Sequence, residues 1–246
     1  MRKKIIVASS IYVAVFLLWI FYANQGSWLP SPWKVLVRGI SSFSILSSHI
    51  TFTVKTMFFS LGLAIMISLP LSWLMSKVAW MRLAVQSFFI LFQCLPMFAL
   101  APLMILWFGW TQVAVIVPTT LMLIFPLIIN FTKGFSAVPV EYEQLFSIHG
   151  ASEQEMFFKL RLPYALPFIF SGLRVAISFS GAGAIAGEWA GAQRGLGVFL
   201  QECRRDLDVE GLLVGLFCLL FLTLIFYLSL YVLEKVFCKE VRFEAL

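Results

Sequence analysis

The chain has 246 residues, of which 61% are hydrophobic and 12% charged, and its formal net charge is +6. An ordinary soluble domain is about 45–50% apolar and about 25% charged, so this composition excludes a water-soluble globule and indicates an integral membrane protein. The basic residues flank apolar runs instead of forming one stripe among polar groups, which argues against nucleic-acid binding.

Six apolar runs predict six transmembrane helices, and therefore an all-α, polytopic membrane protein. In chain order they cover residues 5–23, 54–76, 83–108, 113–131, 166–187 and 212–233. The first run follows the basic residues 1–4, has about nineteen residues at about 1.5 Å each, and lacks a small-residue cleavage site. We therefore interpret it as a membrane span rather than a signal peptide.

Residues 24–50 begin as a polar, turn-rich stretch and become weakly amphipathic through Trp33, Val35, Leu36 and Ile40. We interpret this stretch as an external surface connector. The alternative is an interfacial helix that lies on the outer leaflet with its apolar side chains in the lipid.

Four prolines lie inside the predicted third and fourth spans, where each removes a helix hydrogen bond and bends the axis. They are Pro96, Pro102, Pro118 and Pro126. Such breaks survive in a membrane where neighbouring protein or a watery cavity satisfies the freed carbonyls. Residues 93–96, Gln-Cys-Leu-Pro, therefore either border a transport path or form a packing kink.

Residues 138–163 interrupt the apolar runs and predict a helix, a glycine turn and a second helix. Pro139 suits the first helical position, where its missing N–H costs nothing, and Glu141 and Glu143 then face the positive end of the helix dipole. Gly150 can end this helix in the left-handed conformation.

A capping box formed by Ser152 and Glu155 predicts that the second short helix begins directly after the glycine turn. This helix is expected to end at Pro163. Its apolar side would carry Met156, Phe157 and Leu160.

The fifth span is rich in small residues at helical spacing. One series recurs every four residues at Gly172, Ala176, Ser180 and Ala184, and a second comprises Gly183, Gly187 and Gly191. Small residues at this spacing let two helix backbones approach closely, which is how helices associate in lipid. We expect this helix to be buried, either against its own bundle or across a twofold axis.

The distribution of basic residues sets the orientation of the chain. Eleven of them flank the spans on one side and five on the other, and the side with the excess is expected to be the cytoplasm. Both termini and residues 138–163 are therefore predicted to be cytoplasmic, and residues 188–211 to lie outside.

Residues 138–163 resemble the cytoplasmic loop of the permease subunits of bacterial ATP-binding-cassette (ABC) importers. The family's glycine and Leu-Pro spacing is kept by Gly150, Ala151, Leu160, Leu162 and Pro163. The family's Glu-Ala-Ala positions are occupied here by Gln-Leu-Phe at residues 144–146. It stays open whether Gln144, Glu141 or Glu143 makes the family's contact with the ATPase subunit.

Two further stretches resemble the nitrate, sulfonate, taurine and thiamine-precursor branch of these permeases. They are Leu-Pro-Ser-Pro at residues 29–32, and Gly-Glu-Trp-Ala-Gly-Ala at residues 187–192 with Gly-Leu-Gly at residues 195–197. The resemblance extends over most of the chain that follows the first predicted span.

The resemblance implies the transmembrane fold of a type I ABC importer. Residues 1–53 would form an N-terminal helix and connector, residues 54–236 the transport domain, and residues 237–246 a cytoplasmic tail. It also implies a permease of the bacterial inner membrane, working as a homodimer with two copies of an ATPase and an external substrate-binding protein. The ATPase would hold ATP and Mg, and residues 138–163 would transmit its closure to the membrane bundle.

Candidate path or gate residues lie in the fifth span, namely Arg174, Ser180, Glu188 and Trp189. Arg174 would either attract an anionic substrate or pair with another helix near the inner leaflet. Glu188 and Trp189 would form an outer gate or a docking face for the binding protein. Otherwise Trp189 is an interface anchor and Glu188 a solvated helix end.

The sequence lacks the motifs that catalysis would need. It has no G-x-x-x-x-G-K-[ST] loop, and its four cysteines and two histidines lack the spacing of a metal or redox site. We predict that the chain is not an enzyme and itself binds no cofactor or metal. The alternative is a self-contained secondary transporter or intramembrane enzyme, against which stand the lack of an evident internal repeat and of paired acids within the spans.

Overall fold

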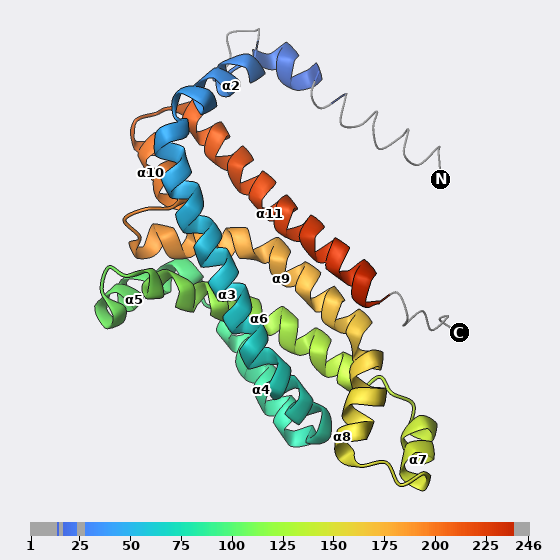
Figure 1. Cartoon of the computed structure of the whole chain (residues 1–246). Coiled ribbons are helices and arrows are strands. Elements are labelled where there is room, and N and C mark those ends of the chain that lie inside the picture. Colours follow the sequence, from blue (N-terminus) through green and yellow to red (C-terminus); the bar gives the residue numbers. More distant parts are fainter. Residues whose placement is uncertain (1–13, 15–16, 24–27, 239–246) are drawn as a thin grey trace.

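The computed structural model describes residue 14 and residues 17–23 and 28–238, and every regular element within these ranges is helical. The predicted all-α class is therefore confirmed for this part of the chain. The predicted first span and the last eight residues of the tail fall largely or wholly outside it. The elements (Figure 1) are Pro32–Ser41 (α2), Phe43–Lys77 (α3), Ala79–Gln93 (α4), Met97–Leu100 (3-10), Ala101–Phe108 (α5), Gln112–Phe135 (α6), Val140–Ile148 (α7), Glu153–Met156 (α8), Phe157–Arg161 (π), Leu162–Gly191 (α9), Leu196–Arg205 (α10) and Val209–Phe237 (α11).

Four helical segments of the described part are long and apolar enough to cross a membrane. They are Phe43–Lys77, Gln112–Phe135, Glu153–Trp189 and Val209–Phe237. These segments contain the predicted second, fourth, fifth and sixth spans, in agreement with a polytopic membrane protein. The count of six remains a prediction, because the first span lies largely outside the described residues and the third is interrupted.

The predicted third span, residues 83–108, is wrong as a single helix. α4 ends at Gln93, a short 3-10 helix covers Met97–Leu100, and α5 follows. Pro96 has no N–H with which to continue α4, and Pro102 occupies the first turn of α5. Two prolines this close end one helix and begin another, where the sequence alone predicts a bend.

α3 begins well before the apolar run at residue 54, inside the predicted connector. The hydroxyls of the polar residues there are satisfied within the helix by backbone carbonyls one turn earlier, as Ser48 donates to Ile45 and Thr51 to Ser47. Boundaries drawn from hydropathy miss this kind of extension.

The connector prediction is also wrong at α2, which is a ten-residue amphipathic helix. Its Val35 is buried in a cluster with α10 and α11, and its other side exposes Trp33, Leu36 and Ile40. The helix of the alternative interpretation is therefore present, while its position on the outer leaflet stays a prediction.

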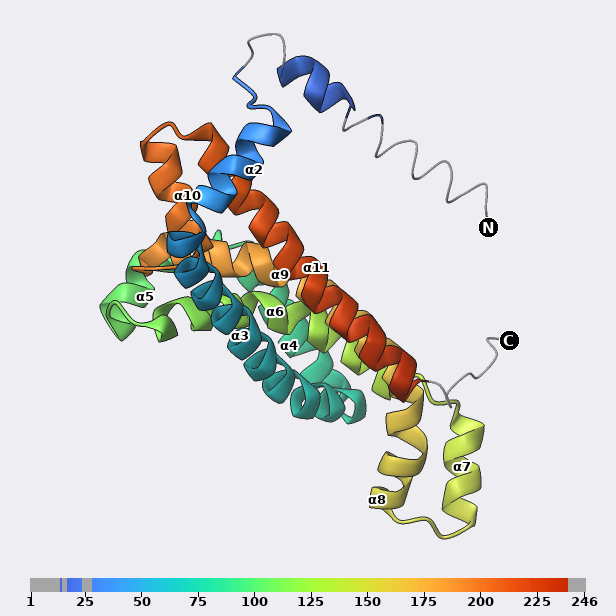
Figure 2. The same ribbon diagram turned by 45° about the horizontal axis from the view of Figure 1, so that its top comes forward.

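α6 and α9 pack side by side through the centre of the molecule, with α3 along α6 and α11 along α9 (Figures 1 and 2). Small residues of α9 permit the close approach. A Cβ atom on Gly187 would lie 2.9 Å from the carbonyl oxygen of Val115, and one on Gly172 would lie 2.9 Å from Cβ of Asn130. The small-residue series thus serves packing within the chain's own bundle, the first of its two expected uses.

The predicted helix, glycine turn and helix are present at residues 138–163, and they project beyond the bundle (Figures 1 and 2). Pro139 is the N-cap of α7 rather than its first helical residue. Gly150 has a φ of +73°, the left-handed conformation that glycine adopts without strain. Ser152 and Glu155 form both hydrogen bonds of the predicted capping box.

The predicted end of the second helix at Pro163 is wrong. The chain passes from α8 through a π-helical turn at Phe157–Arg161 directly into α9. Pro163 then lies in the first turn of α9. Proline has no N–H to donate to the preceding turn, and the wider π-helical turn before it tolerates this missing hydrogen bond. The 138–163 loop is therefore continuous with a central helix of the bundle.

Candidate functional site

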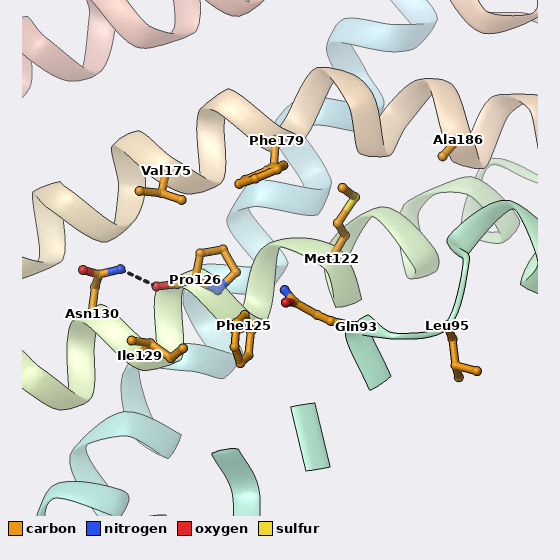
Figure 3. Close-up of a pocket in the computed structure, with 10 residues that line it drawn as sticks. All are labelled: Gln93, Leu95, Met122, Phe125, Pro126, Ile129, Asn130, Val175, Phe179 and Ala186. Carbon is orange, nitrogen blue, oxygen red and sulfur yellow. Dashed lines mark hydrogen bonds between the residues drawn. The ribbon is translucent and has the colours of Figure 1, made fainter. Parts of the chain in front are cut away.

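An open cavity of about 650 Å³ lies between the end of α4, α6 and α9. Its volume falls within the range of about 300–1,000 Å³ that is usual for small-molecule sites. Figure 3 shows the lining side chains, which are Gln93, Leu95, Met122, Phe125, Pro126, Ile129, Asn130, Val175, Phe179 and Ala186.

Pro126 shapes the wall that α6 contributes to this cavity. It lies within the helix and cannot donate to the carbonyl of Met122, one turn earlier, which also lines the cavity. The Asn130 side-chain amide donates to the carbonyl oxygen of Pro126 at 2.8 Å (Figure 3). The Asn130 amide thus adds a polar group to a wall that is otherwise apolar.

The Gln-Cys-Leu-Pro segment at residues 93–96 reaches the same cavity, because Gln93 and Leu95 line it. Gln93 is the last residue of α4, and Leu95 lies in the break that follows it. This placement supports the proposal that the cavity belongs to a transport path.

Arg174 lies elsewhere, on the side of α9 that faces α11. Its Nη1 atom is 2.7 Å from a carboxylate oxygen of Glu234, so the guanidinium forms an ion pair between two helices. Arg174 is not among the residues that line the cavity. This geometry matches the helix-pairing alternative for Arg174.

Ser180 is fully buried and donates its hydroxyl hydrogen bond to the carbonyl of Ile177 in its own helix. It therefore contributes to packing and does not line the cavity. The four candidate residues of the fifth span are not brought together at one place.

Glu188 is 1% exposed, so it is not a solvated helix end. Its carboxylate accepts hydrogen bonds from Thr53 Oγ1 at 2.7 Å and from the Gly197 N–H at 2.6 Å. Trp189 donates from Nε1 to the carbonyl of Gly197 at 2.9 Å. These contacts fasten the end of α9 to α3 and to the start of α10.

His49 and Thr53 complete this network, and sequence reasoning missed both because they precede the predicted second span. Thr53 Oγ1 accepts from the Leu196 N–H at 2.8 Å, and His49 Nδ1 lies 3.1 Å from the nitrogen of Gly195. Two polar residues four positions apart share one face of a helix, and this spacing was the available signal.

The 138–163 loop is braced by ion pairs. Arg161 Nε lies 2.9 Å from Glu143 across the loop, and Lys77 of α3 lies 2.8 Å from Glu153. Glu143 is therefore engaged within the chain, whereas Glu141 is exposed.

The remaining predicted ATPase-contact residues divide by exposure. Gln144 and Gly150 are exposed, Leu160 is buried, and Ala151, Leu162 and Pro163 are half-buried. Leu160 thus packs inside the loop, whereas the exposed residues Gln144 and Gly150 are accessible to another protein.

Large apolar side chains are exposed on α7, at Val140, Tyr142, Leu145 and Ile148. Beside them, a groove of about 400 Å³ runs along the glycine turn between α7 and α8. An apolar patch of this kind on a loop outside the membrane spans is typical of a protein contact surface.

Comparison with known proteins agrees with these features. Residues 60–242 match the family described as binding-protein-dependent transport system inner membrane component. The formylaminopyrimidine transport permease ThiX of Halalkalibacterium halodurans is 34% identical over 85% of this chain and 84% of its own length. The riboflavin permease RibX of Chloroflexus aurantiacus is 30% identical over 69% and 62%, and the taurine permease TauC of Escherichia coli 25% identical over 84% and 78%.

Proposed function

The chain belongs to the family of inner membrane components of binding-protein-dependent transport systems, and from that premise we propose that it couples solute passage to ATP hydrolysis on a separate subunit. It is a multi-pass transport subunit of the membrane and not an enzyme, as its relatives are named transport permeases. In this proposal ATP and Mg are held by an ABC ATPase.

The observation that carries the proposal is the continuity of the 138–163 loop with α9. The exposed loop leads through the π-helical turn into the helix that supplies Val175, Phe179 and Ala186 to the cavity. A displacement of the loop by a closing ATPase would therefore move a wall of the cavity as a rigid body.

We further propose a homodimer with two ATPase copies and an external binding protein. The cavity is open along one side of the chain, and a second copy facing it would enclose a path away from lipid. Both termini and the 138–163 loop would then lie in the cytoplasm.

The solute is proposed to be small and of the sulfonate, nitrate, taurine or thiamine-precursor class. The names of the relatives support this range, since they include permeases for formylaminopyrimidine and taurine. The external binding protein would deliver the solute to the outer side.

The test is co-purification of the tagged chain from its own bacterium in mild detergent. We expect an ABC ATPase to co-purify, and Ile148→Asp to release it because a charge replaces an exposed apolar contact on α7. Glu202→Lys, an exposed change on α10, is the matched control and should keep the ATPase bound. Full solute uptake after deletion of the ATPase would refute the proposal and favour a secondary transporter.

A further inference from the structure

We infer that the cavity between α4, α6 and α9 binds an uncharged, planar ring solute. The side-chain amides of Gln93 and Asn130 would form hydrogen bonds with the polar atoms of this ring. The inference rests on the proposed function, because it takes the cavity as part of the solute path. It narrows the solute from the broad class above to one kind of chemistry.

The apolar part of the lining suits a flat ring. Phe125 and Phe179 present aromatic side chains, and Met122 adds a polarisable thioether that makes favourable contacts with aromatic systems. Phe125 of α6 and Phe179 of α9 lie on the two helices that border the cavity (Figure 3). Aromatic and thioether groups in the lining favour a ring-shaped solute.

The charge of the lining disfavours an anion. None of the ten lining residues is charged, and an anion removed from water needs a cation or several N–H donors to compensate. Arg174, the span cation that would attract an anion, is already paired with Glu234. Lys133 lies one helical turn beyond Asn130 on α6, is exposed, and is not part of the lining.

The two amides provide the recognition that a heterocyclic ring requires. Each primary amide offers an N–H donor beside a C=O acceptor, the pattern that pairs with a ring nitrogen next to an amino group, as Asn and Gln pair with adenine. Asn130 donates one N–H to the carbonyl oxygen of Pro126, and its own oxygen and second N–H remain available to a ligand. Gln93 is exposed and has no hydrogen-bond partner within the described part of the chain. An inorganic anion offers acceptors only and leaves the amide oxygens unused.

The test uses the purified permease–ATPase complex in lipid nanodiscs and saturation-transfer NMR. The ring probe is 4-aminopyrimidine, and taurine and sodium nitrate are the charged competitors. We expect saturable binding of 4-aminopyrimidine that a large excess of nitrate or taurine does not displace. Gln93→Leu and Asn130→Leu should each raise the half-saturating concentration about tenfold, the usual scale for one lost hydrogen bond.

Gln193→Leu, the same substitution at an exposed position of the outer loop, is the matched control and should leave binding unchanged. Lys133→Gln should also leave it unchanged. Because Gln93 bonds no other described residue, its variant separates loss of recognition from loss of folding. Displacement of the probe by nitrate or taurine would overturn the inference, and so would binding in both amide variants that equals that of the parent chain.

The outcome is separable from that of the proposed function. If no ATPase joins the chain, the proposed function itself fails. If the complex forms and hydrolyses ATP but 4-aminopyrimidine does not bind, the coupling role stands and only the solute chemistry is wrong.

Discussion

Glu188 illustrates at the residue scale how a polar group is kept inside this bundle. Its two described hydrogen bonds come from neutral groups, the Thr53 hydroxyl and the Gly197 N–H, and the carboxylate is almost fully buried. Gly195 leaves room for the carboxylate, because a Cβ atom there would overlap it. The residue therefore holds the end of α9 against α3 and the start of α10, and it does not meet solvent.

We expect Glu188→Ala to destabilise the protein by about 1–3 kcal/mol for each donor left without an acceptor. Glu188→Gln retains one oxygen for these donors and should cost clearly less. Thermal unfolding in detergent measures the difference, with Glu202→Ala, an exposed acid of α10, as control. Equal Tm values for Glu188→Ala and Glu202→Ala would contradict the proposed bracing role.

Asp208 gives a pH-dependent prediction outside the spans. Burial alone would raise its pKa, but the hydrogen bond from the Gly211 N–H and the Arg38 guanidinium at 2.7 Å hold the pKa below its usual value. A carboxylate with a depressed pKa stabilises the fold above its ordinary pKa of about 3.9, and this contribution is lost as the pH falls through the folded value.

Asp208→Asn should therefore lower Tm at neutral pH and shrink the fall in Tm between about pH 6 and about pH 3. Asp206→Asn, at an exposed neighbouring position, should leave both quantities near those of the parent chain. A pH profile of Asp208→Asn that matches the parent would show that the ion pair with Arg38 contributes nothing.

At the element scale, the proposed coupling depends on the 138–163 loop, and the glycine turn is the most specific feature of this loop. Proline cannot adopt the φ of +73° that Gly150 has. Gly150→Pro should leave membrane insertion intact and abolish the ATP hydrolysis that the binding protein stimulates. Gly109→Pro changes a glycine with a φ of +66° outside this loop, and it should retain stimulation. Retained stimulation in Gly150→Pro would argue against a coupling role.

Local signals predicted this element well. The capping box at Ser152 and Glu155 and the left-handed Gly150 depend on neighbouring residues only, and both are present in the structure. The end of the second helix at Pro163 was predicted wrongly, because proline also fits the first turn of a helix and a π-helical turn joins α8 to α9 before it.

The cavity could be predicted only in part for a related reason. The prolines indicated where helices would break, and Gln93 and Leu95 do lie at the cavity wall. Asn130, Phe125 and Phe179 gave no signal, since which face of α6 or α9 meets open space depends on tertiary packing. The same holds for Arg174, whose partner Glu234 is sixty positions away in the sequence.

At the scale of the whole molecule, α9 links three regions that the sequence shows as separate. It begins at the 138–163 loop, lines the cavity through Val175, Phe179 and Ala186, and ends at the Glu188 network. A single continuous helix therefore connects the proposed ATPase contact, the proposed solute site and the Glu188 network.

The most direct measurement of the central claim is site-specific photocrosslinking from Leu145, an exposed residue of α7, in intact membranes. A photoreactive residue at this position should crosslink to the ABC ATPase, and labelling of the same position from outside the cell should fail. Crosslinking should disappear in cells that lack the ATPase. A loop that is labelled from outside, or that touches no ATPase while transport proceeds, would contradict the account.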